Sequence, residues 1–329
     1  MATADVTVMG AGVFGLSVAY ACARKGARVQ VIDPHGVAAG SSGGLVGALA
    51  PHVPENWNEK KAFQFKSLIM AEQFWRDVEG LTGEDVGYVR SGRLQPLADE
   101  HAVALARGRA ETAAALWQGK ALWEIVSSGD ANWMPRSPTG LVVHDTLSAL
   151  IHPRRATRAL ADAVIALGGD VLTEGTPQGK TVWATGWPGM QEIGGNGVKG
   201  QAALLRFDAA GKPQLFADAL HIIPHGDGTV AIGSTSEREF DDPFSTDAQL
   251  EAVVSRAKHQ PEAPARRELA GLGGLRSLGE LRPRWGFATY AEAFAVVKAA
   301  IGAGDIYQAN LTFPIDAEVW GRSEDLYAA

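Results

Sequence analysis

The chain contains a single cysteine, Cys22, so it can form neither an intrachain disulfide nor a cysteine metal cluster. This cysteine usage suits a reducing cytoplasm, where we expect the protein to work, and we expect no bound metal. No apolar run reaches transmembrane length, and the apolar N-terminus fits a strand better than a signal peptide. The chain also lacks an excess of positive charge, because 37 Asp and Glu outnumber 30 Lys and Arg and the net charge is −7. The sequence therefore predicts neither a nucleic-acid nor a membrane partner.

The length of 329 residues is too great for one small core and predicts two domains, either sequential or interleaved. A hydrophobic content of 46% and a charged content of 20% are ordinary for a soluble globular protein. The function has to be sought in local motifs.

The strongest motif lies in the first 33 residues. Val6–Met9 is a short apolar run typical of a buried strand, and it leads directly into Gly10-Ala11-Gly12-Val13-Phe14-Gly15. A helical pattern over residues 16–25 and a second strand over residues 28–32 follow, and Asp33 ends that strand. Glycines that follow a strand, open a helix and precede an acid by roughly 20 residues form the dinucleotide-binding fingerprint.

Each part of this fingerprint has a physical role. Gly10 allows the tight turn, Gly12 lets the backbone approach a pyrophosphate, and Gly15 lets the helix pack closely on the strand. The helix N-terminus offers unpaired N–H groups to the phosphates. Asp33 can accept hydrogen bonds from the hydroxyls of an adenosine ribose, and its charge would repel a 2′-phosphate. The fingerprint therefore favours a dinucleotide without a 2′-phosphate over NADP.

Two further segments are predicted to lie along the same cofactor. The first is the small-residue run that begins at Pro34 and continues through Gly40-Ser41-Ser42-Gly43-Gly44 to Gly47, where many backbone N–H groups can approach a ligand. The second is the strand pattern Val182-Trp183-Ala184-Thr185-Gly186, which ends in a small-residue turn. Ligands of open α/β sheets bind at such carboxyl ends of the strands, although Thr185 could equally be a turn former without a partner.

The remaining patterns predict helices and a second sheet. Apolar spacing predicts helices over residues 58–80, 101–117, 153–167 and 246–258, the last capped by Ser245 or Thr246. Strand patterns occur over residues 88–97, 140–143, 169–172, 198–207 and 220–235, with Asp227-Gly228 as a hairpin turn. The later strands predict an antiparallel sheet, so the second domain differs in kind from the first.

Together these motifs resemble the FAD-dependent amino-acid and amine oxidase family that includes D-amino-acid, glycine and sarcosine oxidases. The resemblance rests on the fingerprint, Asp33, the 40–44 loop and the 182–186 segment, and on two later matches. These are the Lys199-Gly200-Gln201 turn and the segment from His225 to Thr235, which is the most discriminating of the matches. The order and spacing fit from about residue 5 to about residue 258.

The resemblance implies an α/β fold, with a Rossmann-type FAD-binding domain interleaved with an antiparallel-sheet substrate domain. The implied FAD-binding segments are residues 1–87 and 150–190, and the implied substrate segments are residues 88–149 and 191–258. The implied cofactor is FAD, and the implied substrate is a small amine or amino acid. The residues that match the family's cofactor contacts are Gly10, Ala11, Gly12, Val13, Phe14, Gly15, Asp33, Pro34, Ser41, Ser42, Gly43, Gly44, Val171, Ala184, Thr185 and Gly186.

The atypical segment 259–329 departs from the family's pattern. Leu281-Arg282-Pro283 is the candidate start of a third flavin-binding segment, and Arg282 is either a substrate-carboxylate clamp or a solvated surface charge. The region around it is rich in Arg, Pro and Gly with weak periodicity. Residues 290–312 resemble an internal piece of the chorismate-binding enzymes such as aminodeoxychorismate synthase component I. We expect this segment to cover the flavin poorly, so that the flavin is weakly held and turnover is low.

The leading functional hypothesis is oxidation of a small amine or amino acid by hydride transfer from its α-carbon to the flavin. Such chemistry needs no obligatory side-chain base, because the flavin carries the redox step. One alternative is the related tRNA-wobble-modifying oxidoreductase, which the acidic net charge disfavours. Another is a truncated or fused chain that binds nucleotide without turnover. A purified yellow protein would favour the first two hypotheses, and a colourless one the third.

Overall fold

The computed structural model describes residues 3–129, 133–195, 197–243 and 245–258, with the backbone of four two-residue strands beyond them. The chain divides into two compact units, Met1–Pro261 and Glu262–Ala329. Most of the atypical segment 259–329 and its chorismate-enzyme resemblance therefore lie outside the described residues. In the second unit, β14 (Ser277–Leu278) pairs antiparallel with β17 (Val319–Trp320), and β15 (Arg282–Pro283) pairs antiparallel with β16 (Ile315–Asp316).

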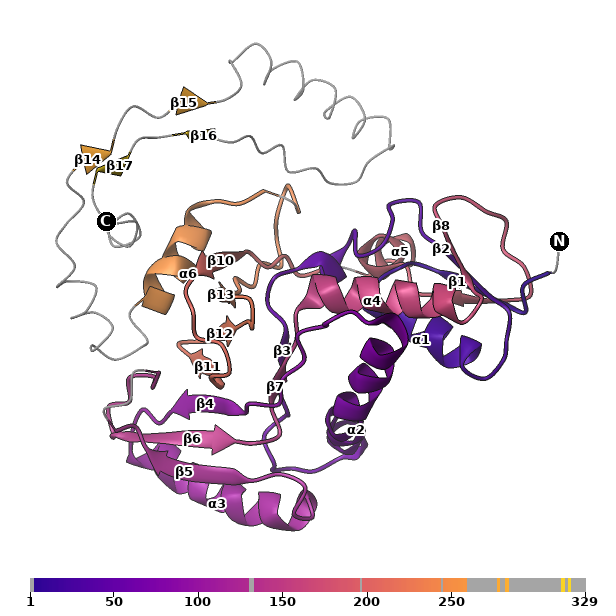
Figure 1. The fold of residues 1–329 in the computed structure, drawn as a ribbon. Coiled ribbons are helices and arrows are strands. Elements are labelled where there is room, and N and C mark those ends of the chain that lie inside the picture. The colour runs from indigo at the N-terminus through magenta and orange to yellow at the C-terminus, as the bar shows by residue number, and fades with distance from the viewer. Residues whose placement is uncertain are drawn as a thin grey trace. The chain divides into compact units, whose positions relative to one another are not determined.

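The first unit contains a parallel sheet with the strand order β8-β2-β1-β9, of which Figure 1 labels β8, β2 and β1. Its strands are β1 (Val6–Met9), β2 (Val29–Ile32), β8 (Asp170–Leu172) and β9 (Lys180–Trp183). All three pairings are parallel, with Val8 in register with Val31 and with Val182. This arrangement confirms the predicted βαβ unit at the N-terminus.

Three helices build the core beside this sheet: α1 (Val13–Ala23), α2 (Glu59–Thr82) and α4 (Pro153–Ala166). The side chain of Asn58 caps α2 by accepting a hydrogen bond from the Lys61 N–H, and Gly83 ends it in a left-handed conformation. Pro153 occupies the first turn of α4, where no N–H donor is needed. The sequence predicted α2 and α4 to within two residues.

A second, seven-stranded sheet has the order β10-β13-β12-β11-β4-β6-β5 (Figure 1). It consists of two antiparallel blocks, β5-β6-β4 and β11-β12-β13-β10, which are joined by a parallel pairing of β4 with β11. The sheet is therefore mixed, whereas the sequence predicted it to be wholly antiparallel. Its strands are β4 (Arg93–Pro96), β5 (Trp123–Ser127), β6 (Leu141–Asp145), β10 (Ala202–Arg206), β11 (Gln214–Ala217), β12 (Leu220–Pro224) and β13 (Thr229–Gly233).

The two faces of the mixed sheet are covered differently. On the outer face, Leu94, Leu215 and Ile222 pack with Val253 of α6 (Ala248–Lys258). On the opposite, inner face, α3 (Glu100–Leu116) covers the β5–β6 side. The β12–β13 side of that inner face packs on the end of the glycine-rich loop (residues 34–47) and the residue after it, where Ile223 and Ala231 contact Leu45, Val46 and Ala48. The inner face is thus the one turned toward the predicted cofactor segment.

Short elements complete the first unit. Ser41–Gly43 forms a single 3₁₀ turn, and β3 (Ala48–Leu49) pairs antiparallel with β7 (Ala149–Leu150). The sequence did not predict β3, β5, β7, β11 or the short helix α5 (Gly186–Glu192). The cap of α6 also differs from the prediction: the Asp247 carboxylate accepts a hydrogen bond from the Gln249 N–H at 2.9 Å, so Asp247 caps this helix in place of Ser245 or Thr246.

Candidate functional site

The glycine turn between β1 and α1 has the close packing that its sequence predicts. Gly10 has φ +114°, and a methyl group there would lie 2.3 Å from the carbonyl oxygen of Ala184. A methyl group on Gly15 would lie 2.0 Å from the carbonyl oxygen of Gly10. No side chain fits at either position. Ala184 also donates its N–H to the Met9 carbonyl, so the segment after β9 lies directly against the fingerprint.

The N-terminus of α1 presents free donors. The N–H groups of Gly12, Phe14 and Gly15 make no hydrogen bond to any described residue, and no acidic side chain lies in the first turn. The N–H of Val13 donates to the Ser42 hydroxyl at 2.9 Å, which ties the glycine-rich loop to the helix. An anion placed here would meet unpaired N–H groups and the positive end of the helix dipole.

Asp33 has a second role that the sequence did not indicate. One carboxylate oxygen accepts the Ala11 N–H at 2.8 Å, and the other accepts the His35 N–H at 3.0 Å. Asp33 therefore holds the glycine turn in place from the end of β2. Each carboxylate oxygen keeps a further lone pair, so both remain able to accept a ribose hydroxyl.

Three contacts fix the glycine-rich loop to its surroundings. Arg154 donates through Nε to the Gly43 carbonyl at 2.6 Å, and Ile151 donates its N–H to the Gly47 carbonyl at 3.0 Å. Nε2 of His225 lies 3.3 Å from the Leu45 carbonyl and must be the donor there, because a carbonyl only accepts. The loop is therefore held by both α4 and the β12–β13 turn, although its sequence resembles a free linker.

The ring of His225 lies 4.8 Å from the ring of His152, centroid to centroid. Burial lowers the pKa of both histidines, and the charge of His225 lowers the pKa of His152 further. Both rings are therefore neutral at neutral pH. This matches the donor role of His225 toward the loop.

These geometric features agree with a comparison against protein families. Residues 5–299 match the family described as DAO, FAD dependent oxidoreductase. The chain belongs to the DAO family. The match extends past residue 258, where the sequence resemblance ended, so part of the C-terminal segment also follows the family pattern.

The DAO fold is also found among solved structures. Glycine oxidase from Geobacillus kaustophilus is 18% identical, with a TM-score of 0.65 over 78% of each chain. Glycine oxidase from Bacillus cereus ATCC 14579 is 20% identical, with a TM-score of 0.65 over 80% of this chain and 81% of that one. Iminodiacetate oxidase from Chelativorans sp. BNC1 is 17% identical, with a TM-score of 0.62 over 97% and 84%. At this identity the likeness shows the fold.

Curated relatives match over shorter stretches. The tRNA 5-methylaminomethyl-2-thiouridine biosynthesis bifunctional protein MnmC of Hydrogenovibrio crunogenus is 30% identical over 114 residues, which is 33% of this chain and 17% of the relative. MnmC of Albidiferax ferrireducens is 52% identical over 54 residues, which is 16% of this chain and 9% of the relative. The chain thus matches less than a fifth of the length of either relative.

The cofactor of the DAO family is FAD, and the described residues fit it. The glycine turn, the free N–H groups of α1 and the Asp33 carboxylate provide sites for a pyrophosphate and a ribose. Ser42 keeps its hydroxyl proton for a phosphate oxygen, because its oxygen acts as the acceptor from Val13. Among the described residues, no group of three His, Cys, Asp or Glu side chains could hold a metal ion, and no helix is long and apolar enough to cross a membrane.

The structure brings most of the predicted cofactor contacts together. Gly10 to Gly15, Asp33, Ser42 and Ala184 meet at the carboxyl ends of β1, β2 and β9. Nearby positions are exposed: Pro34, Gly44 and Thr185 lie in the adjoining loops, Ser41 begins the 3₁₀ turn and Gly186 begins α5. Val171 lies within β8, and its side chain packs on the core, so any cofactor contact there would come from its backbone. Arg282 begins β15 in the second unit, and its role remains a prediction.

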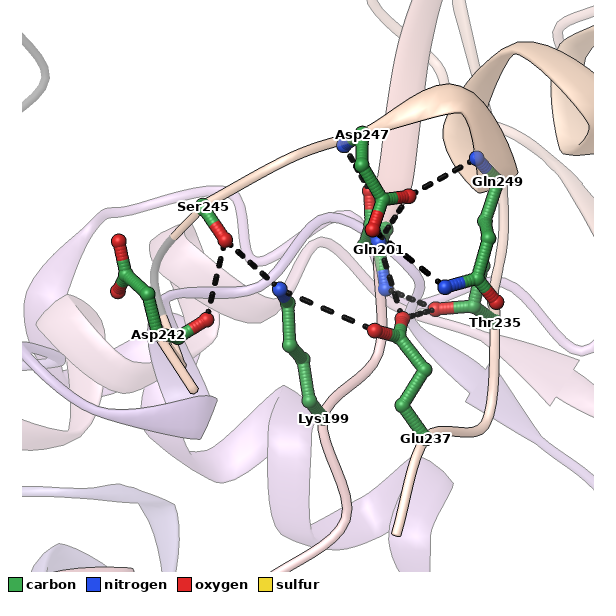
Figure 2. Close-up of polar contacts among 8 residues, drawn as sticks. All are labelled: Lys199, Gln201, Thr235, Glu237, Asp242, Ser245, Asp247 and Gln249. Atoms are coloured by element: carbon green, nitrogen blue, oxygen red, sulfur yellow. Dashed lines mark hydrogen bonds and ion pairs between the residues drawn. The ribbon is translucent and has the colours of Figure 1, made fainter. Parts of the chain in front are cut away.

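A polar network fastens the Lys199-Gly200-Gln201 turn to β13 and α6, as Figure 2 shows. The side-chain amide of Gln201 donates to Glu237 at 3.0 Å and to Asp247 at 2.9 Å. Nζ of Lys199 is buried and lies 3.0 Å from the Ser245 hydroxyl and 3.8 Å from Glu237. The hydroxyl of Thr235, and then the Gln201 amide, lower the pKa of Glu237, so its carboxylate stays charged. The sequence signalled this turn by its likeness to the family, but it did not reveal the network.

Sequence reasoning missed a buried charge pair on the inner face of the mixed sheet. Nε of Arg93 donates to the Asp145 carboxylate at 2.9 Å, and both residues are buried. The only available signal was Arg93, a charged residue within the strand pattern over residues 88–97, because Asp145 lies beyond the strand predicted over residues 140–143.

Proposed function

We propose that this DAO-family chain oxidises a small amine or amino acid, with FAD as the hydride acceptor. The observation that carries the proposal is the contact between the inner face of the mixed sheet and residues 45–49. Residues 45–47 end the glycine-rich loop and Ala48–Leu49 follow it as β3, so the sheet faces the segment assigned to the cofactor. When bound, FAD supplies the redox chemistry by accepting a hydride from the substrate's α-carbon.

The protein's own residues bind and orient the reactants. The α1 N–H groups and the Ser42 hydroxyl bind the pyrophosphate, and Asp33 accepts the ribose hydroxyls. The apolar contacts of Leu45, Val46 and Ile223 exclude water between the loop and the sheet. No proton-abstracting side chain is required if the amine reacts in its neutral form.

The test begins with the visible absorbance of the purified protein. A bound flavin should be seen, and anaerobic mixing with glycine, sarcosine, D-alanine or D-proline should bleach it. A flavin that no amine or amino acid reduces would overturn the proposed reaction while leaving the family in place. Rapid reduction with tight retention of flavin through dialysis would show that the C-terminal segment completes the site, against our expectation that it covers the flavin poorly.

A second candidate is oxidation of a modified tRNA base, which the stretches similar to MnmC favour. The net charge of −7 opposes it, because phosphate contacts normally come from an excess of Lys and Arg. Gel-shift titration with total tRNA at low and moderate salt distinguishes the two candidates. Salt-sensitive binding together with flavin reduction by the modified tRNA would support this candidate over the first.

A further inference from the structure

His152 and His225 join two of the elements that hold the glycine-rich loop. His152 directly precedes α4 and follows Ile151, whose N–H donates to the Gly47 carbonyl at 3.0 Å. His225 lies in the β12–β13 turn, and its Nε2 donates to the Leu45 carbonyl at 3.3 Å. The two rings lie 4.8 Å apart, centroid to centroid. The ring pair therefore connects the supports of two positions at the end of the loop.

Hydrogen bonds fix the backbones of both histidines. The N–H of His152 donates to the Val86 carbonyl at 3.1 Å, and its carbonyl accepts the Ala156 N–H at 3.0 Å. The N–H of His225 donates to the Thr229 carbonyl at 2.8 Å, and His225 is only 2% exposed. A buried ring on a fixed backbone can leave its place by turning out toward solvent. In His225 this movement breaks the hydrogen bond to the loop.

Each ring has a buried nitrogen without a partner. Nδ1 of His152 and Nδ1 of His225 are sealed off from solvent and make no hydrogen bond to a described residue. Because Nε2 of His225 carries the proton that is donated to the loop, Nδ1 of the neutral ring has a bare lone pair. A proton added there would create a buried N–H donor without an acceptor, which is costly. Protonation therefore favours a ring that has turned out to solvent.

The charged groups beside the pair come from α4, the β12–β13 turn and the segment before β4. Arg155 of α4 donates to Asp227 of the turn at 2.9 Å and lies 3.4 Å from Asp85, and its neighbour Arg154 binds the Gly43 carbonyl. These two guanidiniums and two carboxylates balance, so a proton on either ring adds uncompensated charge. Burial is the largest cause that lowers the pKa of both rings, and Arg155 lowers both further. Asp227 opposes the shift of both rings, and the bond to the loop opposes that of His225, but the pKa values remain lowered.

We propose that the His152–His225 pair is an acid-operated latch on the cofactor loop. At neutral pH both rings are neutral, and His225 holds the loop in place. In acid the rings turn outward, the Leu45 carbonyl loses its donor, and FAD binds more weakly. The pKa of each ring in the closed latch lies below the ordinary value of 6.5, so the latch is complete above about pH 6.5 and is lost as the pH falls below it. This inference rests on the assignment of the loop to FAD and does not depend on which amine is oxidised.

The test is the affinity for FAD at two pH values, which requires no turnover. FAD is titrated into the apoprotein at about pH 7.5 and at about pH 5, with flavin fluorescence as the readout. The wild type should bind FAD about tenfold more weakly at the lower pH. His225→Phe removes the donor and should bind at the higher pH about as weakly as the wild type does at the lower one. Far-UV circular dichroism at both pH values separates release of the loop from acid unfolding.

Two variants separate the latch from other titrating groups. His225→Gln keeps an N–H donor but takes up no proton, so its FAD affinity should change by less than about twofold between the two pH values. His101→Gln removes an exposed histidine of α3 and is the matched control, which should keep the pH dependence of the wild type. The proposal is wrong if the wild type binds FAD equally at both pH values. It is equally wrong if folded His225→Gln shows the pH dependence of the wild type.

Hydrogen exchange provides a second readout without FAD. Once the intrinsic pH dependence of exchange is removed, the amides of residues 41–49 in the apoprotein should open more often at the lower pH in the wild type than in His225→Gln. Equal opening in the two proteins would overturn the latch. Opening confined to the wild type, with FAD affinity independent of pH, would overturn its control of FAD binding. A bound flavin that no amine reduces would overturn the oxidase function alone.

Discussion

The parallel sheet and the mixed sheet treat buried polar groups in opposite ways. In the parallel sheet the buried polar side chains are neutral: Thr7 and Gln30 hydrogen-bond to each other at 2.8 Å. In the mixed sheet a guanidinium and a carboxylate, Arg93 and Asp145, are buried together. The parallel sheet leads into free backbone N–H groups at the start of α1, whereas the buried charges of the mixed sheet belong to side chains that pair with each other.

The largest effect, on FAD binding, is expected at Asp33, the side chain that supports the backbone site at the start of α1. Asp33→Ala should weaken FAD binding by the loss of two charge-assisted hydrogen bonds to the ribose, each on the order of 1.5–3 kcal/mol. Asp33→Asn is the control. Its amide oxygen can still accept the Ala11 N–H, so this variant keeps the geometry of the glycine turn while it removes the charge. Fluorescence titration of FAD into the apoprotein measures both. Unchanged FAD affinity in Asp33→Ala would show that the ribose lies elsewhere.

Removing the buried carboxylate of Asp145 from the mixed sheet should lower the stability of the protein. Asp145→Ala leaves Arg93 buried without its carboxylate, which costs about 3–5 kcal/mol in the free energy of unfolding. Arg93→Met/Asp145→Leu should recover most of that loss, because paired apolar replacements are often neutral. Urea unfolding of the two variants measures the difference. Equal stability of Asp145→Ala and wild type would mean that the pair is not desolvated.

A smaller effect is expected from a methyl group in the glycine turn. Gly15→Ala should destabilise the protein by about 1–3 kcal/mol and weaken FAD binding, because its new methyl group meets backbone rather than a side chain that can move. Gly80→Ala is the matched control: Gly80 lies in α2 with open space around it, so the change should be neutral or stabilising. A Gly15→Ala protein with normal stability and flavin content would contradict the close packing described here.

The smallest expected effect is a pH dependence of stability to which His221 of the mixed sheet contributes most. His221 has a folded-state pKa of about 4, below the ordinary value of 6.5, so the unfolded chain takes up its proton first. Its contribution to stability is complete above about pH 6.5 and is lost as the pH falls toward about 4, by an amount on the order of 2 kcal/mol. His221→Phe should flatten the pH profile of urea unfolding across that window. His152 and His225, whose pKa values are also lowered, should leave a residual slope.

The parallel sheet was predictable because its signal is local. From Val6 to Asp33 the strand, turn, helix and acid follow one another within a single βαβ unit, and their spacing carries the geometry. The sequence did not show that Asp33 also accepts the Ala11 N–H, because the ribose-binding role already accounts for an acid at that position. The dinucleotide-binding βαβ unit followed from this local pattern, whereas FAD and the second sheet domain were implied by the resemblance to the oxidase family.

The mixed sheet was less predictable because its deciding contacts join distant segments. Arg93 meets Asp145 only when β4 pairs with β6, and no motif marks either residue. β11 follows the Gly211-Lys212-Pro213 turn and has only four residues, too few to show a period. The parallel pairing of β4 with β11 could not be inferred, because the two strands lie far apart in the sequence and no local pattern links them.

That parallel junction also has a consequence for how the chain folds. The β5-β6-β4 block can form from a continuous stretch of sequence, but β4 has no partner on its other edge until β11 has been synthesised. Bringing Arg93 and Gln214 into register closes a long loop, and long-range pairings of this kind slow folding more than they alter stability. We therefore expect the two antiparallel blocks to form first as separate units and to dock late, and the inner face of the sheet to be completed only at that step.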